Sequence, residues 1–126
     1  MKQGILVRAL DLSHKVIEFT DDTAYQVIKD SVGGWIDHCK VKGYGIDIWV
    51  NDTGLVDGLE LNYWATAVAS ENFGQFYPLA GDVFITGLPD AEGYSKGIDP
   101  EALPLIIASL IDAQFAKLIV KSQSDE

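Results

Sequence analysis

The stretch TDDTAYQVIKDSVGGWIDHCKVKGYGIDIWVNDTG, residues 20–54, contains the signals that decide the fold. Residues 20–22 supply capping oxygens and negative charge for the start of a helix, and apolar residues then recur at helical spacing. Residues 33–34 are both glycine and end this helix, because glycine adopts the left-handed conformation without a Cβ penalty. Residues 35–41 and 44–50 follow as two strands. The stretch therefore predicts a helix followed by two strands.

Strand signals also flank this stretch on both sides. Residues 4–10 and 15–19 predict a β-hairpin, and the apolar, β-branched residues 82–86 predict a core strand. Another short strand is expected at residues 55–61, followed by a helical turn over residues 62–69.

A long helix is predicted near the end of the sequence. Residues 99–101 (Asp-Pro-Glu) have the order typical of a helix start, a cap followed by proline and an acid, and Pro104 is expected to move the true start a few residues on. The elements together predict an α+β fold. Its small, mostly antiparallel sheet has about five strands, with one helix after the first hairpin and a long C-terminal helix. Residues 1–121 are expected to form a single domain, and residues 122–126 a disordered tail.

The composition argues against two kinds of partner. Of 126 residues, 48% are hydrophobic and 22% are charged, as in a globular domain. The net charge is −10 and Arg8 is the only arginine, so we expect no nucleic-acid binding through a basic surface. The same charge repels anionic membranes, and the longest apolar region, residues 102–111, is shorter than the roughly 20 residues that span a bilayer. We therefore expect no membrane association.

The cysteine content indicates a compartment. Cys39 is the only cysteine, which excludes an intrachain disulfide and fits reducing conditions. The apolar run near the N-terminus is too short for a secretion signal. The expected localisation is cytoplasmic.

Three segments resemble one family. Residues 25–37 (YQVIKDSVGGWID) are similar to its helix followed by Val-Gly-Gly, an aromatic residue and Ile. Residues 50–55 (VNDTGL) and 61–62 (LN) are similar to its Asn-acid-x-Gly turn and downstream Leu-Asn, and residues 80–87 (AGDVFITG) resemble its closing strand. The family is domain of unknown function 3846, and the resemblance covers roughly residues 4–98. It implies a phage, plasmid or other mobile element, and the host-cell cytoplasm for a phage protein. It transfers no catalytic residue.

One triplet resembles a catalytic motif. Aspartic proteases place a carboxylate in a triplet such as Asp52-Thr53-Gly54, and two carboxylates then share a proton across a dimer. Asn51 and Leu55 depart from the apolar and small residues expected on either side. The triplet also belongs to a strong turn sequence, so a hairpin turn is favoured and an acid protease using Asp52 is kept as an alternative.

No cluster has the spacing of a metal site. His38 and Cys39 are adjacent, so on a strand they point to opposite faces and cannot readily serve one site. Asp82, Asp90 and Glu92 are too few for a calcium loop. We predict no catalytic residue, no metal site and no cofactor.

The aromatic residues are the candidates for binding a partner or ligand. Trp49 points away from the apolar side of its strand, so it is either exposed or covered by the last helix or by the loop of residues 70–79. Exposed aromatic patches mark interaction surfaces. The candidates are Trp49, Tyr63, Trp64, Phe76 and Tyr77.

The last helix is apolar on nearly every side, which is typical of a helix buried on several sides. A domain of this size can hardly cover so wide an apolar surface alone. We therefore expect a homo-oligomer in which this helix packs on its own sheet and on a second copy. The candidate interface residues are Ile107, Leu110, Phe115 and Leu118.

Three functions remain open on the sequence alone. The first is a non-enzymatic phage or mobile-element accessory protein that binds and modulates a host protein, in anti-defence or takeover. The second is a protein that binds and sequesters a small molecule such as a signalling nucleotide, whose phosphates would meet Arg8, Lys40, Lys42 or Lys96. The third is the acid-protease-like enzyme that uses Asp52.

Overall fold

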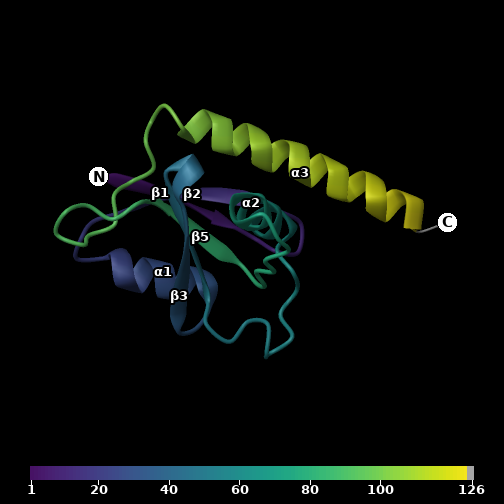
Figure 1. Ribbon diagram of the computed structural model, residues 1–126, viewed down its shortest axis with the longest axis horizontal. Coiled ribbons are helices and arrows are strands. Elements are labelled where there is room, and N and C mark those ends of the chain that lie inside the picture. The colour runs from purple at the N-terminus through teal and green to yellow at the C-terminus, as the bar shows by residue number, and fades with distance from the viewer. Residues whose placement is uncertain (125–126) are drawn as a thin grey trace.

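The computed structural model describes residues 1–124, and within them five strands form one antiparallel sheet in the order β2-β1-β5-β4-β3 (Figure 1). The central strand β5 is buried at every residue. The predicted α+β fold is confirmed. The strands are β1 (Lys2–Val7), β2 (His14–Phe19), β3 (Ile36–Val41), β4 (Ile46–Asn51) and β5 (Val83–Gly87).

The first hairpin is present, with a shorter first strand than predicted. β1 and β2 pair along their full lengths. Residues 8–13 form the connecting turn, in which the Arg8 N–H donates to the Ser13 carbonyl and the Leu12 N–H donates to the Arg8 carbonyl. Because these bonds turn the chain immediately after Val7, the strand does not continue to residue 10.

The helix after the hairpin, α1 (Ala24–Val32), ends where the sequence predicted. Gly33 follows it at φ 78°, a conformation that costs glycine little. The expected capping residues 20–22 lie directly before the helix, although its first turn contains no acid. The Thr23 N–H donates to the Thr20 hydroxyl at 3.3 Å, and the Thr20 N–H donates to the Thr23 hydroxyl at 2.9 Å.

A second helix, α2 (Tyr63–Phe73), is longer than the predicted helical turn. It begins after Asn62, whose side-chain oxygen accepts a hydrogen bond from the Ala65 N–H. The strand predicted at residues 55–61 is wrong. These residues form consecutive turns, and only Leu61 makes an isolated bridge, to Ala80.

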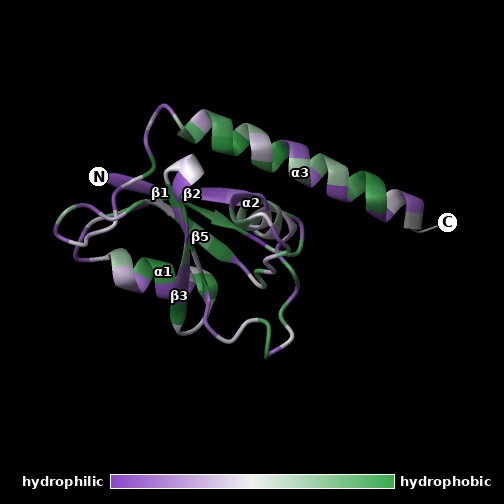
Figure 2. Ribbon diagram, viewed as in Figure 1, coloured by the Kyte–Doolittle hydropathy of each residue, from purple (hydrophilic) through white to green (hydrophobic). Residues whose placement is uncertain are grey.

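The last helix, α3 (Leu103–Ser124), begins one residue before Pro104 and continues past residue 121. Residues 125–126 of the predicted tail lie outside the described residues. Within residues 1–124, Leu103–Gln123 is the one helix that is long and apolar enough to cross a membrane, by length and composition only. The sequence prediction considered only the shorter apolar run at residues 102–111 and did not indicate such a helix. Figure 2 shows hydrophobic residues along the length of this helix.

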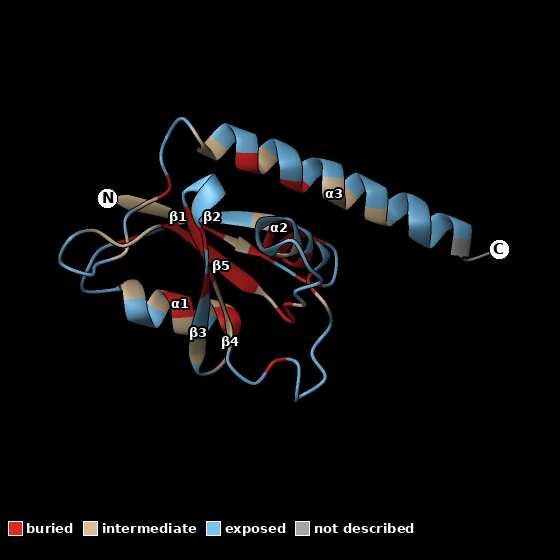
Figure 3. Ribbon diagram, in the orientation of Figure 1, coloured by how far each residue is buried: buried red, intermediate tan, exposed pale blue. Residues whose placement is uncertain are grey.

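The core has two parts, one on each face of the sheet. On one face, α1 packs through Ile28 against Phe19 and Phe84. On the other face, α2 and the first half of α3 cover a larger cluster that includes Trp64 and Leu110. Figure 3 shows that the side of α3 away from the sheet is exposed, and Figure 1 shows its C-terminal half projecting past the sheet. The position of α3 therefore leaves the outer side of this helix without a partner in its own domain.

Candidate functional site

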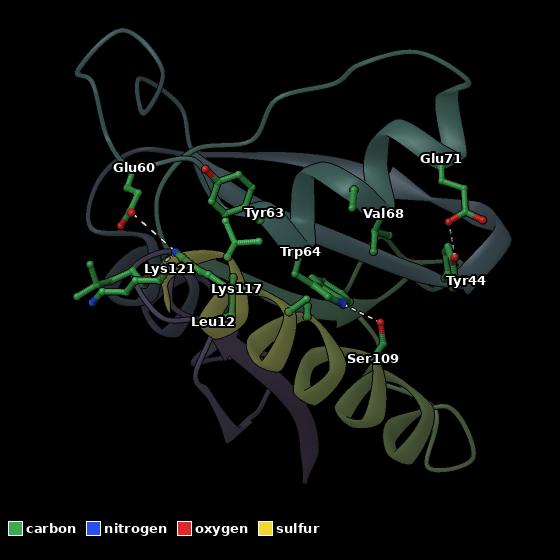
Figure 4. A pocket seen from close by; sticks show the side chains of 15 residues that line it. Leu12, Tyr44, Glu60, Tyr63, Trp64, Val68, Glu71, Ser109, Lys117 and Lys121 are labelled. Carbon is green, nitrogen blue, oxygen red and sulfur yellow. Dashed lines mark hydrogen bonds and ion pairs between the residues drawn. The ribbon is translucent and has the colours of Figure 1, made fainter. Parts of the chain in front are cut away.

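A groove of about 720 Å³ lies between α2, the C-terminal half of α3 and the turn after β1 (Figure 4). Its volume is in the range of ligand-binding clefts in proteins. Apolar side chains line most of it, with tyrosines and charged groups among them. The lining residues include Leu12, Tyr44, Glu60, Tyr63, Trp64, Ala67, Val68, Glu71, Ala113, Ala116, Lys117 and Lys121.

Helical periodicity places these side chains on facing sides of the two helices. On α2 the lining residues are 63, 64, 67, 68 and 71, and on α3 they are 109, 113, 116, 117, 120 and 121, spacings that lie on one side of a helix. Ala67 on α2 faces a wall of α3 that includes Ala113 and Ala116. Because these side chains are small, the two helices leave a hollow between them.

The floor of the groove also joins the two helices. Trp64 is buried, and its Nε1 donates a hydrogen bond to the Ser109 hydroxyl at 3.0 Å. Figure 4 shows this bond bridging α2 and α3. Tyr63, next to it, is exposed. The pair therefore supplies one structural and one accessible aromatic residue.

Lys117 fixes α3 to the rest of the domain. Its Nζ donates to the carbonyls of Ala9 at 2.8 Å and Leu10 at 2.6 Å, and lies 3.7 Å from a carboxylate oxygen of Glu60. The same ammonium lies 5.2 Å from the centre of the Tyr63 ring. An ammonium group has three protons to donate, so Lys117 has few left for a bound anion.

The rim of the groove is acidic at two places. Glu60 is about half exposed beside Lys117. Glu71 accepts a hydrogen bond from the Tyr44 hydroxyl at 3.1 Å, and this bond raises the pKa of Tyr44. The groove therefore combines an apolar interior with two carboxylates and the ammonium groups of Lys117 and Lys121, which suits an apolar segment that carries charged groups.

The structure brings together only two of the five predicted aromatic candidates, Tyr63 and Trp64. Phe76 is exposed in the loop after α2 and does not line the groove. Tyr77 lines a different and smaller cavity, of about 360 Å³.

Trp49 lies on the opposite face of the sheet. It packs with Phe84 in the cluster under α1, and its Nε1 donates to the Thr86 hydroxyl at 3.0 Å. Neither the last helix nor the loop of residues 70–79 covers it, which corrects the expectation. Alternation along β4 gave the correct face, but the order of the strands decides that α1 packs there.

Asp52 lines the smaller cavity together with Asp37 and Tyr77. Residues 51–54 form a turn, which the Asn51 side chain closes by accepting from the Thr53 N–H at 3.0 Å. The turn leads to α2 rather than to a paired strand, so it is not the expected hairpin turn. The acid-protease alternative would require the Asp52 carboxylate of a second copy beside this one. The described residues also contain no group of three or more potential metal ligands among His, Cys, Asp and Glu.

The four predicted interface residues of α3 divide between two environments. Leu110 is fully buried in the core of its own chain and Ile107 packs against that core, so Leu110 cannot contribute surface to an interface. Phe115 and Leu118 are exposed.

Sequence reasoning missed a buried carboxylate on the α1 face. Asp47 is buried, and its two oxygens lie 2.8 and 3.0 Å from Nδ1 of His38, whose ring stacks on Trp49 at 4.8 Å. Burial raises the pKa of Asp47, and the hydrogen bond from His38 opposes this rise. The register of the β3–β4 pair places His38 opposite Trp49 and Lys40 opposite Asp47, so His38 and Asp47 are diagonal neighbours on one face of the sheet. Knowing this register would have predicted the contact between His38 and Asp47.

His38 and Cys39 point to opposite faces, as expected. Cys39 is buried in the larger cluster, and burial raises the pKa of its thiol. The two side chains therefore do not form one site.

Comparison with known proteins gives one result on relatedness. A family model described as Domain of unknown function (DUF3846) matches residues 1–111. No curated protein and no solved structure matches the chain.

Proposed function

Since the chain belongs to the DUF3846 family, a domain of unknown function, we propose a function from the geometry of its groove: the protein binds a segment of a host protein between α2 and α3. In this proposal it is a non-enzymatic accessory protein of a phage or other mobile element. It acts in the host cytoplasm and modulates its partner in anti-defence or takeover. The observation that carries the proposal is the open, mostly apolar groove between two helices.

The shape of the groove favours an amphipathic helix as the occupant. Two helices form its walls, and their small residues Ala67, Ala113 and Ala116 allow a third backbone to approach closely. Recognition of a helix in a groove depends on apolar side chains at one side of the helix. Leu12 and Val68 supply apolar contacts for such side chains.

The charge of the protein favours a basic partner. Glu60 and Glu71 line the groove together with Lys117 and Lys121, so the preference rests on the chain as a whole, which carries a net charge of −10. Complementary charge steers association and selects among partners. We therefore expect the bound helix to carry Lys or Arg beside its apolar side.

The same observations give less support to the alternative of a signalling nucleotide. Arg8, Lys40, Lys42 and Lys96, the cations expected to meet phosphates, do not line the groove. Lys117 and Lys121 do line it, and the Lys117 ammonium group already donates to two backbone carbonyls. An acid protease has less support still, because Asp52 lies in the separate, smaller cavity.

The test combines photocrosslinking with a variant that fills the groove. A benzophenone amino acid in place of Tyr63, in cells of a bacterial host, should crosslink a host protein that the same probe at Gln26 on α1 does not capture. The captured protein is then purified and its affinity for the wild-type chain is measured by calorimetry. Ala67→Trp, which fills the groove, should weaken binding by at least about tenfold.

Gln26→Trp is the matched control, since Gln26 is exposed on α1, and it should leave affinity unchanged. Equal affinities for wild type and Ala67→Trp would show that the partner does not occupy the groove and would refute the proposal. Crosslinking of one protein from both probe positions would do the same.

A further inference from the structure

Helix α3 has a second apolar stripe on the side that faces away from its own domain. Its residues follow one another at spacings of 4, 3, 4, 3 and 4, the heptad pattern of a helix that pairs with another helix. We call this stripe the outer seam. It consists of the apolar residues Pro104, Ala108, Ile111, Phe115 and Leu118, and the polar Ser122 ends it.

The outer seam is exposed over its whole length. Ile111 is 53% exposed, Phe115 65% and Leu118 61%, and Figure 3 shows this side of the helix as exposed. The opposite side of α3 is already occupied: Leu110 lies in the core, and residues beyond it line the groove. A partner of the outer seam therefore has to come from outside the domain.

We propose that the outer seam pairs with the outer seam of a second copy, as two antiparallel helices related by a two-fold axis. Phe115 lies near the middle of the exposed apolar residues, so it meets its own counterpart at the axis. Ile111 then lies opposite the Leu118 of the second copy. This pairing goes beyond the proposed host binding and does not depend on it.

The exposed area is sufficient for a weak, specific dimer. Ile111, Phe115, Leu118 and the flanking Ile119 together expose on the order of 400 Å² of apolar surface per copy. Two copies bury about 800 Å² through these residues alone, and the flanking surface brings the contact toward the low end of specific interfaces, about 1,200 Å². We therefore expect association at micromolar concentrations.

Charge and helix polarity favour the antiparallel arrangement. Antiparallel helices place opposite ends of their dipoles side by side. Asp112 flanks the outer seam, and in a parallel pair the two Asp112 carboxylates would lie at the same level. Each copy also carries a net charge of −10, and the antiparallel pair places the two sheet domains toward opposite ends of the contact.

A lipid bilayer is the other environment that could cover the outer seam, since Leu103–Gln123 is long and apolar enough to cross one. Spanning would require α3 to leave the core, where Leu110 is buried and Ser109 bonds to Trp64. Lying on an anionic surface would require cations beside the seam, whereas Lys117 and Lys121 line the groove. The second copy is therefore the occupant that these contacts favour.

Sedimentation equilibrium from roughly 1 to 300 µM measures the dimer. Phe115→Glu should raise the dissociation constant at least ~100-fold, because each copy would bury an unpaired carboxylate. Val120→Glu is the matched control: Val120 is on the same helix and 65% exposed, but it lines the groove. It should change the constant by less than about threefold while weakening host binding, so the two proposals fail separately. A wild-type chain that stays monomeric at the highest concentration, or equal effects of the two variants, would overturn the proposal.

Disulfide formation tests the register, in a Cys39→Ala background. Phe115→Cys should crosslink with itself, and Ile111→Cys should crosslink with Leu118→Cys in a mixture of the two. Self-crosslinking of Ile111→Cys as efficiently as Phe115→Cys would indicate a parallel pair and overturn the antiparallel arrangement. Flotation with neutral and with anionic phospholipid vesicles should recover no protein, and recovery that Phe115→Glu abolishes would show that lipid, rather than a second copy, covers the seam.

Discussion

Replacing Leu110 by Ala tests the docking of α3, on which both proposed surfaces depend. Leu110 is fully buried among residues of the sheet and α2, whereas Leu105 on the same helix is 73% exposed. Removing a fully buried leucine side chain loses its transfer free energy and leaves a cavity, at a cost of about 3–5 kcal/mol. Leu105→Ala removes a side chain that is already mostly in water, so its cost is below about 1 kcal/mol.

The two variants are compared by urea unfolding, which is monitored by circular dichroism. The protein concentration is kept below that at which the proposed dimer forms. Neither residue belongs to the outer seam, so pairing should not affect the comparison. A difference of about 3 kcal/mol is a large part of the stability of a domain of this size, and it corresponds to a fall in the melting temperature of about 10 °C or more. If the two variants unfold within about 1 kcal/mol of each other, α3 is not docked through Leu110. The groove between α2 and α3 would then lose its second wall.

Two further predictions concern buried polar groups. Asn62→Ala should destabilise the protein by about 2–4 kcal/mol in urea unfolding. The Asn62 side chain caps α2 and donates to the carbonyls of Val7 and Gly81, and the substitution removes all of these hydrogen bonds. Asn72→Ala, at an exposed position, is the control, and equal losses of stability in the two variants would contradict this role of Asn62. Burial raises the pKa of Asp47 above its unfolded value of 3.8, so the folded state binds this proton more tightly and stability falls as pH rises from about 4 through the raised pKa. The stability of Asp47→Asn relative to wild type should therefore increase between about pH 4 and pH 8, and a decrease would show that the His38 hydrogen bond outweighs burial.

Local signals in the sequence were sufficient for most of the fold. Residues 83–86 are β-branched or aromatic, and a buried strand follows from that pattern. Gly33 ended α1 as predicted. These features depend on neighbours in the chain, which is why a single sequence reveals them.

Helix α2 was underestimated for a physical reason. It buries Trp64, Ala65, Val68 and Ala69 against the sheet and α3, and Ala67 on its groove side is small and apolar too. A helix with no distinct polar side gives a weak periodic signal. Its strongest sequence signal was Asn62, a residue type that caps helices, and α2 begins directly after Asn62.

The groove could not be predicted, because its walls come from distant parts of the chain. The turn after β1, the helix after residue 62 and the helix after residue 102 meet only in the folded molecule. Tyr63 and Trp64 were correct candidates for one surface by residue type alone, and the same reasoning selected Trp49, which lies on the other face of the sheet. Residue type therefore indicated which side chains suit binding, but tertiary structure determines which of them share a site.

A glycine and an asparagine in the segments that resemble the family have structural roles, as expected if these segments serve folding. Gly81, in the segment 80–87, has φ 88°, and a Cβ there would approach the Leu59 side chain to 2.9 Å. Asn62, in the Leu-Asn motif, is buried with its side chain hydrogen-bonded at both ends. The residues that first indicated the family thus hold the turns and helix α2 in place, and they lie outside the opening of the groove except where α2 begins.

The family match ends at residue 111, within α3, so part of each proposed surface lies beyond it. Leu110, which docks the helix, lies inside the match. Ala113 and Lys117 of the groove, and Phe115 and Leu118 of the outer seam, lie beyond it. Membership of the family therefore accounts for the sheet and for the position of α3, but it carries no information on what α3 binds. Any transfer of function to or from another member has to be judged also on the residues that follow position 111, because in this chain those residues supply most of one wall of the groove and half of the seam.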